Sequence, residues 1–153
     1  MSGAASRTYG HQWERDCATL LSATLDLDVR SARSVTGGTQ DGADLVTVHD
    51  DGQIVHTVEG WHVECKASHN PHQPVPWMRQ ARLQADSDLY AVLAKNPRKP
   101  VGDGTVYLTL RAFRWWCGDG LAVFEHDPTV VWLSVTAWTA LLQLDLPTRT
   151  TDG

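Results

Sequence analysis

The chain has 153 residues, of which 42% are hydrophobic and 20% charged, a size and composition typical of one globular domain. This composition excludes wholesale disorder, collagen and coiled coil. Three widely spaced cysteines with no signal peptide before them argue against a disulfide scaffold and favour a reducing cytoplasm. The least polar stretch, residues 128–144, is too short and too often interrupted by polar side chains to span a bilayer, so no membrane partner is expected.

The net charge of −5 conceals a gradient along the chain. Residues 1–61 carry four basic and nine acidic side chains, residues 62–100 carry six and three, and residues 101–153 carry three and six. Only the middle third is therefore basic. A protein with acidic ends and a basic middle can still bind a polyanion locally, particularly where a bound cation neutralises some of the carboxylates.

Helix-like and strand-like patterns alternate along the chain. An apolar stripe from Trp13 to Thr24 predicts a helix over residues 10–25, after a frayed N-terminal segment. The predicted strands cover residues 28–35, 43–49, 53–58, 61–65, 89–94, 105–110 and 130–135. Two more helices are predicted, over residues 76–86 and from the last strand to about residue 144. This order predicts an α/β fold with a mixed central β-sheet flanked by helices.

The residues that carry chemistry lie on two of these strands. Asp44 begins an apolar strand after a glycine-rich turn, and Glu64, Cys65 and Lys66 end another strand twenty residues later. Because side chains alternate between the faces of a strand, Glu64 and Lys66 point one way and Cys65 points the other way. If the two strands are neighbours, Asp44 and Glu64 offer two oxygen ligands to Mg²⁺, with an ammonium group beside them. That arrangement is typical of enzymes that cleave phosphodiester bonds.

Asp44, the nineteen-residue gap and Glu64-Cys65-Lys66 resemble the PD-(D/E)XK nuclease superfamily, and more narrowly the archaeal-type and phage Holliday junction resolvases. Five further features of those resolvases occur here in the same order: Glu14-Arg15, Arg33, Thr36-Gly37, Gln80 and the apolar strand at residues 89–94. The resemblance covers roughly residues 7–113 and implies a restriction-endonuclease-like core. It departs from the family pattern at Ala43, where proline is usual, and at Cys65, where an aliphatic residue is usual.

The resemblance also implies how the chain is divided. A single nuclease domain is expected over residues 1–153, with its core at about residues 7–113. Residues 114–153 form a C-terminal strand–helix extension with no counterpart in the family pattern, so its role is left open.

The resemblance implies a role for each matching residue. Asp44 and Glu64 would hold Mg²⁺, which Mn²⁺ can replace, with the backbone carbonyl of Cys65 as a third ligand. Lys66 would position or activate the attacking water, and Glu14 and Gln80 would assist it. Hydrolysis would leave a 5′-phosphate and a 3′-hydroxyl. Contacts to DNA phosphates are expected from basic side chains in and before the middle third: Arg33, Arg79, Arg82, Lys95, Arg98 and Lys99.

The sequence thus predicts a Mg²⁺-dependent DNA endonuclease that resolves branched DNA such as Holliday junctions. Cutting two strands symmetrically needs two active sites, so a homodimer is expected, in the cytoplasm of the cell or of a viral host. Two alternatives on the same fold remain. One is a restriction-type or repair-type nuclease of the same superfamily, and the other is a DNA-binding module that lacks catalysis.

Two interpretations without nuclease chemistry also apply to these residues. Taken alone, Glu64 and Lys66 fit a solvent-facing ion pair worth about 0–1 kcal/mol. A zinc-stabilised structural protein is suggested by the spacing of His62, Cys65, His69 and His72. The alternation of a strand opposes that zinc site, because His62 shares a face with Glu64 whereas Cys65 lies on the other face.

Overall fold

The structure is a computed structural model that describes residues 3–37, 42–116 and 130–144. Its elements in chain order are α1 (Gly3–Leu25), β1 (Val29–Ser31), α2 (Ala32–Thr36), β2 (Leu45–Val48), β3 (Ile54–Val55), β4 (His62–Lys66), α3 (Pro74–Gln84), β5 (Tyr90–Ala94), the 3-10 helix η1 (Val101–Asp103), β6 (Thr105–Thr109), α4 (Leu110–Trp116), β7 (Val130–Ser134) and α5 (Val135–Gln143). No helix in these ranges is both long enough and apolar enough to cross a membrane. Cys117 lies outside the described residues.

The strands form two sheets, one of three antiparallel strands in the order β1-β2-β3 and one of four in the order β4-β5-β6-β7. In the second sheet β4 and β5 are parallel, whereas β5-β6 and β6-β7 are antiparallel. The α/β class and a mixed sheet are therefore as predicted. The predicted meander is correct for β2 and β3, which pair as a hairpin, but its third strand, β4, belongs to the other sheet.

A tight turn separates the two sheets. Val58 and Trp61 form an isolated bridge around Glu59 and Gly60, which both have positive φ, 50° and 82°. Glycine adopts this left-handed backbone without strain, so the chain reverses sharply there. Beyond the turn, β4 pairs with β5 in parallel. The chain connects these two strands through α3, since a parallel pair needs a long crossover connection.

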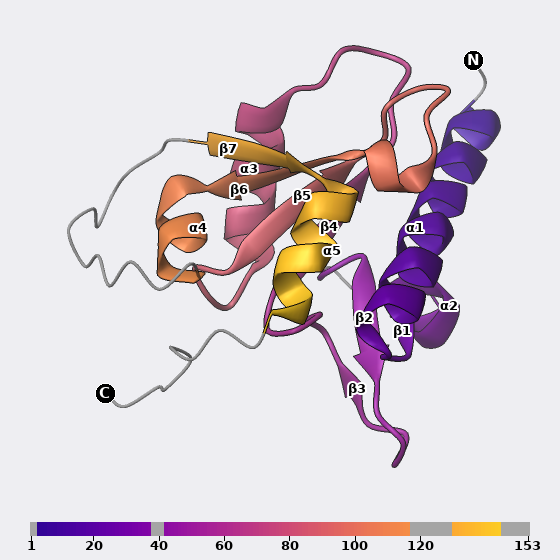
Figure 1. Cartoon of the computed structure of the whole chain (residues 1–153). Coiled ribbons are helices and arrows are strands. Elements are labelled where there is room, and N and C mark those ends of the chain that lie inside the picture. Colours follow the sequence, from indigo (N-terminus) through magenta and orange to yellow (C-terminus); the bar gives the residue numbers. More distant parts are fainter. Residues whose placement is uncertain (1–2, 38–41, 117–129, 145–153) are drawn as a thin grey trace.

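Helices cover both faces of the four-stranded sheet, with α3 behind it and α5 in front of it in Figure 1. The face toward α1 and α5 contains the larger core, in which Trp13, Leu21 and Trp138 are fully or almost fully buried. The opposite face packs Tyr90 and Val92 of β5 against α3. Odd-numbered residues of β4 therefore face α1, and even-numbered residues face α3.

Two local elements differ from the sequence prediction. Helix α1 begins at Gly3, not at residue 10, because extending a helix from a buried segment costs little once it is nucleated. The strand predicted over residues 28–35 is limited to β1, and α2 follows it directly, ending at Gly37 with a φ of 77°. This early turn into α2 carries Arg33 back toward α1, where its Nε lies 3.9 Å from Glu14 Oε2.

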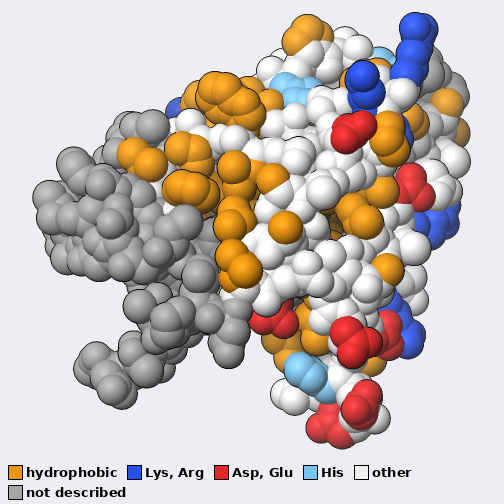
Figure 2. All heavy atoms as spheres, viewed as in Figure 1, with side chains coloured by type: hydrophobic (Ala, Val, Ile, Leu, Met, Phe, Trp, Pro, Cys, Tyr) orange, Lys and Arg blue, Asp and Glu red, His pale blue; other side chains and the backbone are white. Residues whose placement is uncertain are grey.

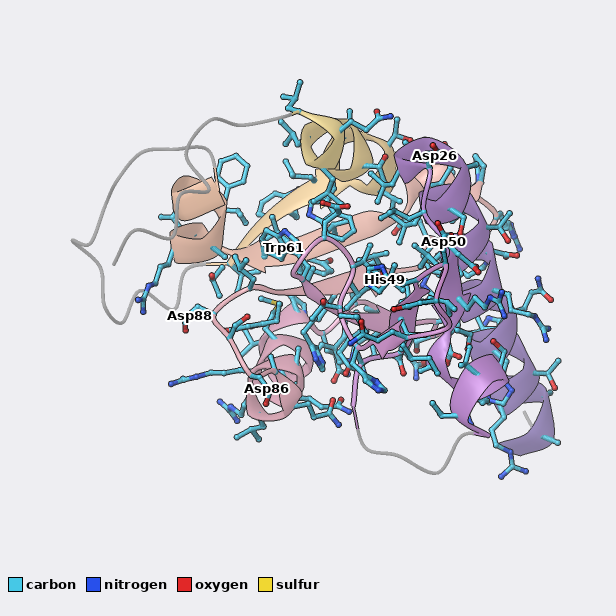
Figure 3. All side chains as sticks on the ribbon, turned by 90° about the horizontal axis from the view of Figure 1, so that it is seen from below. Asp26, His49, Asp50, Trp61, Asp86 and Asp88 are labelled. Carbon is cyan, nitrogen blue, oxygen red and sulfur yellow. The ribbon has the colours of Figure 1, made fainter. Side chains whose placement is uncertain are left out.

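The C-terminal strand and helix join the main core. β7 pairs with β6 over its whole length, and the Ser134 hydroxyl caps α5 by accepting a hydrogen bond from Ala137 N at 3.0 Å. In α5, Trp138 meets the fully buried Trp61 edge-on, with ring centroids 5.9 Å apart. Figure 3 shows Trp61 near the middle of the molecule, beneath the sheet.

Gly104 fixes how closely α1 approaches the end of β5. A Cβ at Gly104 would lie 2.8 Å from Trp13 Cη2 and 3.1 Å from the Ala94 carbonyl oxygen. Trp13 cannot move easily, because its Nε1 donates a hydrogen bond of 2.9 Å to Leu93 O in the core. We expect Gly104→Ala to lower the free energy of unfolding by about 1–3 kcal/mol, measured by chemical denaturation.

Gly10 provides the matched control for that prediction. It lies within α1, and a Cβ added there would meet no atom within 4 Å, so Gly10→Ala should raise the free energy of unfolding by about 0.5–1 kcal/mol. Equal effects of the two substitutions would contradict the close approach of Trp13 to Gly104.

Candidate active site

Asp44 is attached to the free edge of β4. Its backbone N donates to Val63 O at 2.9 Å, and its side-chain Oδ2 accepts from Cys65 N at 2.7 Å. Through these two bonds Asp44 adds a single residue to the outer edge of the four-stranded sheet, although β2, which follows Asp44, belongs to the other sheet. Asp44 is thereby fixed beside the segment that contains Glu64 and Lys66, as the sequence pattern required.

Glu64 and Lys66 share the α3 face of β4 with a glutamine of α3. Glu64 is buried, with 3% of its surface exposed, and its Oε2 lies 3.9 Å from Lys66 Nζ. Lys66 Nζ also donates a hydrogen bond of 2.8 Å to Gln80 Oε1. Gln80, one of the residues singled out in the sequence, therefore faces Lys66, with its amide oxygen bonded to the ammonium.

Glu14 reaches the same region from α1. It is buried, and its Oε2 accepts a hydrogen bond of 2.9 Å from the Ser31 hydroxyl at the end of β1. The guanidinium of Arg33 lies 3.9 Å from the same oxygen, so Arg33 is placed next to the site. One hydroxyl and one cation thus orient the carboxylate of Glu14.

The electrostatics of Asp44 reflect this gathering of carboxylates. Burial raises the pKa of Asp44 to about 7, and the negative charges of Glu64 and Glu14 act in the same direction. The hydrogen bond from Cys65 N and the charge of Lys66 act against the rise but do not cancel it. The charged form of Asp44 is therefore disfavoured by burial and by the neighbouring carboxylates, and a divalent cation bound there would offset both effects.

The backbone of β4 supports the third predicted ligand. His62 N donates to Leu89 O and Lys66 O accepts from Lys95 N, so even-numbered residues turn their backbone groups toward β5. Cys65 lies between them and turns its backbone to the opposite edge, where its N meets Asp44. Its carbonyl oxygen faces that same edge. Two carboxylates and one carbonyl are a donor set of the hard oxygen type that Mg²⁺ prefers.

The described residues contain no group of three or more His, Cys, Asp or Glu side chains arranged to hold a metal ion. Asp44, Glu64 and the Cys65 carbonyl provide only two side-chain ligands, because the third ligand is a backbone oxygen. Asp44 Oδ2 and Glu64 Oε1 already accept hydrogen bonds, from Cys65 N and from the ring of His62. The second oxygen of each carboxylate would serve a cation.

The side chains of the zinc alternative have separate partners. His62 Nε2 lies 2.9 Å from Glu64 Oε1, His69 stacks on Tyr9, and His72 bonds to the Tyr107 hydroxyl and to Lys95 O. The pKa of the Cys65 thiol is raised well above its ordinary value by a hydrogen bond to Cys17 and by burial. A thiol in that state is a poor source of the thiolate that zinc requires.

The predicted DNA contacts fall into two groups. Lys95, which follows β5, donates its backbone N to Lys66 O, and its ammonium lies 5.4 Å from the ring centre of Tyr9 and 5.1 Å from that of Trp13. Its backbone is therefore held beside that of Lys66, but its ammonium lies on the α1 face, whereas Lys66 Nζ bonds to Gln80 on the α3 face. The remaining predicted contacts are exposed on α3 or in the loop before η1: Arg79, Arg82, Arg98 and Lys99.

Acidic side chains lie at other parts of the surface. Figure 2 shows them gathered at the lower end of the molecule, where the β2–β3 hairpin carries Asp50 and Asp51. In Figure 3 the labelled Asp26, Asp86 and Asp88 come from the segments that follow α1 and α3. The net charge of −5 is therefore distributed unevenly over the surface.

Two residues at the site were not predicted. His62 contacts Glu64 from two positions earlier on the same strand face, so strand alternation alone contained the signal. Ser31 contacts Glu14 only because α1 packs on β1, and no motif around Ser31 indicates this.

Comparison with protein-family models, curated proteins and solved structures finds no match for this chain. The function therefore has to be argued from the geometry of the site.

Proposed function

We propose that this protein is a Mg²⁺-dependent DNA endonuclease of the PD-(D/E)XK type that acts on branched DNA. One observation carries the proposal. Asp44 is bonded to Cys65 N at 2.7 Å, so it stands beside the strand of Glu64 and Lys66, with a pKa raised to about 7 by burial and by two further carboxylates. Because the raised pKa means that the charged form of Asp44 costs stability, this buried carboxyl group is better explained by a function than by a contribution to the fold.

The proposed site divides the work among its residues. Asp44 and Glu64 would hold Mg²⁺ with the Cys65 carbonyl, and the ion would supply charge neutralisation and a more acidic water. Lys66, held by Gln80 at 2.8 Å, orients the attacking water and stabilises negative charge on the phosphate oxygens. The water oxygen bonds to phosphorus as the bond to the 3′-oxygen breaks, which leaves a 5′-phosphate and a 3′-hydroxyl.

Partner and oligomeric state are part of the same proposal. Arg33 supplies a cation next to Glu14, Lys95 supplies one on the α1 face, and the exposed arginines of α3 supply more distant contacts to the DNA backbone. Resolution of a symmetric junction needs two copies of the site, so we propose a homodimer on DNA. A protein that stays monomeric on junction DNA in size-exclusion chromatography would contradict resolution.

The experiment is cleavage of a panel of end-labelled DNAs: a four-way junction, a flap, a single strand and a linear duplex. Each is incubated with the protein in Mg²⁺ and in chelator. We expect Mg²⁺-dependent cleavage of the branched substrates, with 5′-phosphate ends that a ligase can seal. Preferential cleavage of linear duplex would instead support a restriction-type enzyme. Binding of every branched DNA without cleavage would contradict the proposed nuclease activity and would support the alternative of a DNA-binding module without catalysis.

A further inference from the structure

A pocket of about 240 Å³ opens directly beside Lys66. Its lining includes the cation Lys66, the aromatic residue Trp77 and three residues with polar side chains, Ser68, Asn70 and Gln73. The pocket lies between the end of β4 and the start of α3, within the loop that connects them. It therefore adjoins the proposed position of the scissile phosphate, and the cleavage chemistry described above does not use it.

The aromatic wall of this pocket is braced from behind. The ring of Trp77 lies 5.5 Å from that of His72 and 6.5 Å from that of Tyr107, measured between ring centres. His72 is itself fixed, because its two ring nitrogens lie 2.8 Å from the Tyr107 hydroxyl and 2.9 Å from Lys95 O. Trp77 thus presents a flat, positioned surface beside Lys66, which is the kind of surface on which a nucleobase stacks.

The polar side chains of the pocket fit the edge of a base. Asn70 and Gln73 are amides, each with a donor and an acceptor group, and Ser68 adds a hydroxyl. Groups of these types pair with the Watson–Crick edge of a base, which is accessible only where the base is unpaired. The remaining end of the pocket is the cationic Lys66, which suits the phosphate attached to that base.

We propose that this pocket receives one unpaired nucleobase of the strand being cut, next to the scissile phosphate. The inference rests on the proposed nuclease function and narrows its substrate class. DNA would be a substrate where a nucleotide is unstacked at the cleavage position, as at a branch point or flap. A continuous linear duplex would have to unstack a base first, at a cost in free energy.

The test uses a flap DNA with 2-aminopurine at the nucleotide next to the cleavage position, whose fluorescence changes when its stacking partners change. Binding is measured in chelator, so that the DNA stays intact while Lys66 is retained. We expect a fluorescence change on binding that disappears when Trp77→Ala is added and is kept with Trp77→Phe. The same signal in the Trp77→Ala protein would overturn the proposed pocket.

Cleavage rates provide the second readout, in proteins that retain Lys66. Trp77→Ala should lower kcat/KM on the flap by about tenfold, the loss expected for one stacked base. Gln73→Ala should also lower it, and this exposed side chain makes no cap hydrogen bond to α3, so its loss leaves the fold intact. Leu83→Ala, on the same helix with 81% of Leu83 exposed, is the control and should cut at the wild-type rate.

The outcomes separate the two proposals. If the wild-type protein cuts no DNA in Mg²⁺, the nuclease function fails. If the wild-type protein cuts flap DNA and both Trp77→Ala and Gln73→Ala cut it equally well, only the nucleobase pocket fails. Thermal unfolding of each variant distinguishes a lost activity from a lost fold.

Discussion

Replacing Lys66 with methionine is expected to lower the single-turnover rate of branched-DNA cleavage by about 10²–10³-fold. The ammonium lies 3.9 Å from Glu64 Oε2 and is held by Gln80, so it is fixed where negative charge develops on the phosphate. Methionine keeps most of the side-chain volume and removes the charge. The measurement is the rate at saturating DNA, together with the DNA affinity in chelator, which should change little.

Arg30→Met is the matched control for the loss of one positive charge. Arg30 is exposed on β1 and pairs with Asp28 at 2.7 Å, away from the carboxylates of the site. Its replacement should leave the cleavage rate unchanged. If the Lys66→Met protein cuts as fast as the Arg30→Met protein, Lys66 has no role in the chemical step.

Replacing Asp44 with asparagine is expected to abolish cleavage and, without metal, to stabilise the fold at about pH 8 by about 4 kcal/mol. The folded pKa of Asp44 is raised from 3.8 to about 7, so the folded state holds this proton more tightly than the unfolded state. The stability of the wild-type protein therefore falls as the pH rises from about 4 to about 7, and the full penalty is present above that window. Asparagine carries no such charge, and its oxygen can still accept from Cys65 N.

The pH dependence distinguishes this effect from a general change in packing. The free energy of unfolding of both proteins is measured in chelator from about pH 4 to about pH 8 by urea denaturation. We expect the advantage of Asp44→Asn to be small at about pH 4 and to grow toward pH 7. An advantage of constant size across that range would show that Asp44 titrates normally, and the three carboxylates would then not form one charged cluster.

Much of the fold could be predicted because burial imposes a simple period on the sequence. The strands that became β2, β4, β5, β6 and β7 were each predicted within a few residues, since apolar runs bounded by turn residues are a local signal. The pairing of β4 with β5 was not a local signal. This pairing follows a reversal of the chain at Glu59 and Gly60, which have positive φ values, and it joins two strands that are separated in the chain by α3.

The site shows the same division between local and tertiary information. Strand patterns indicated Asp44, Glu64 and Lys66, and the resemblance to a nuclease family added Glu14 and Gln80. The Ser31 hydroxyl could not be predicted, because its contact with Glu14 joins residues on α1 and β1 through packing alone. The pocket wall at Trp77 also depends on tertiary contacts, with His72 and Tyr107.

The central claim is that Asp44 and Glu64 share one divalent cation. Electron paramagnetic resonance of Mn²⁺ titrated into the protein at about pH 8 counts the ions bound per chain, since free and bound Mn²⁺ differ in signal. We expect one bound ion per wild-type chain, displaced by Mg²⁺, and none in either Asp44→Asn or Glu64→Gln when each is folded by circular dichroism. Full binding retained by both variants would contradict the claim.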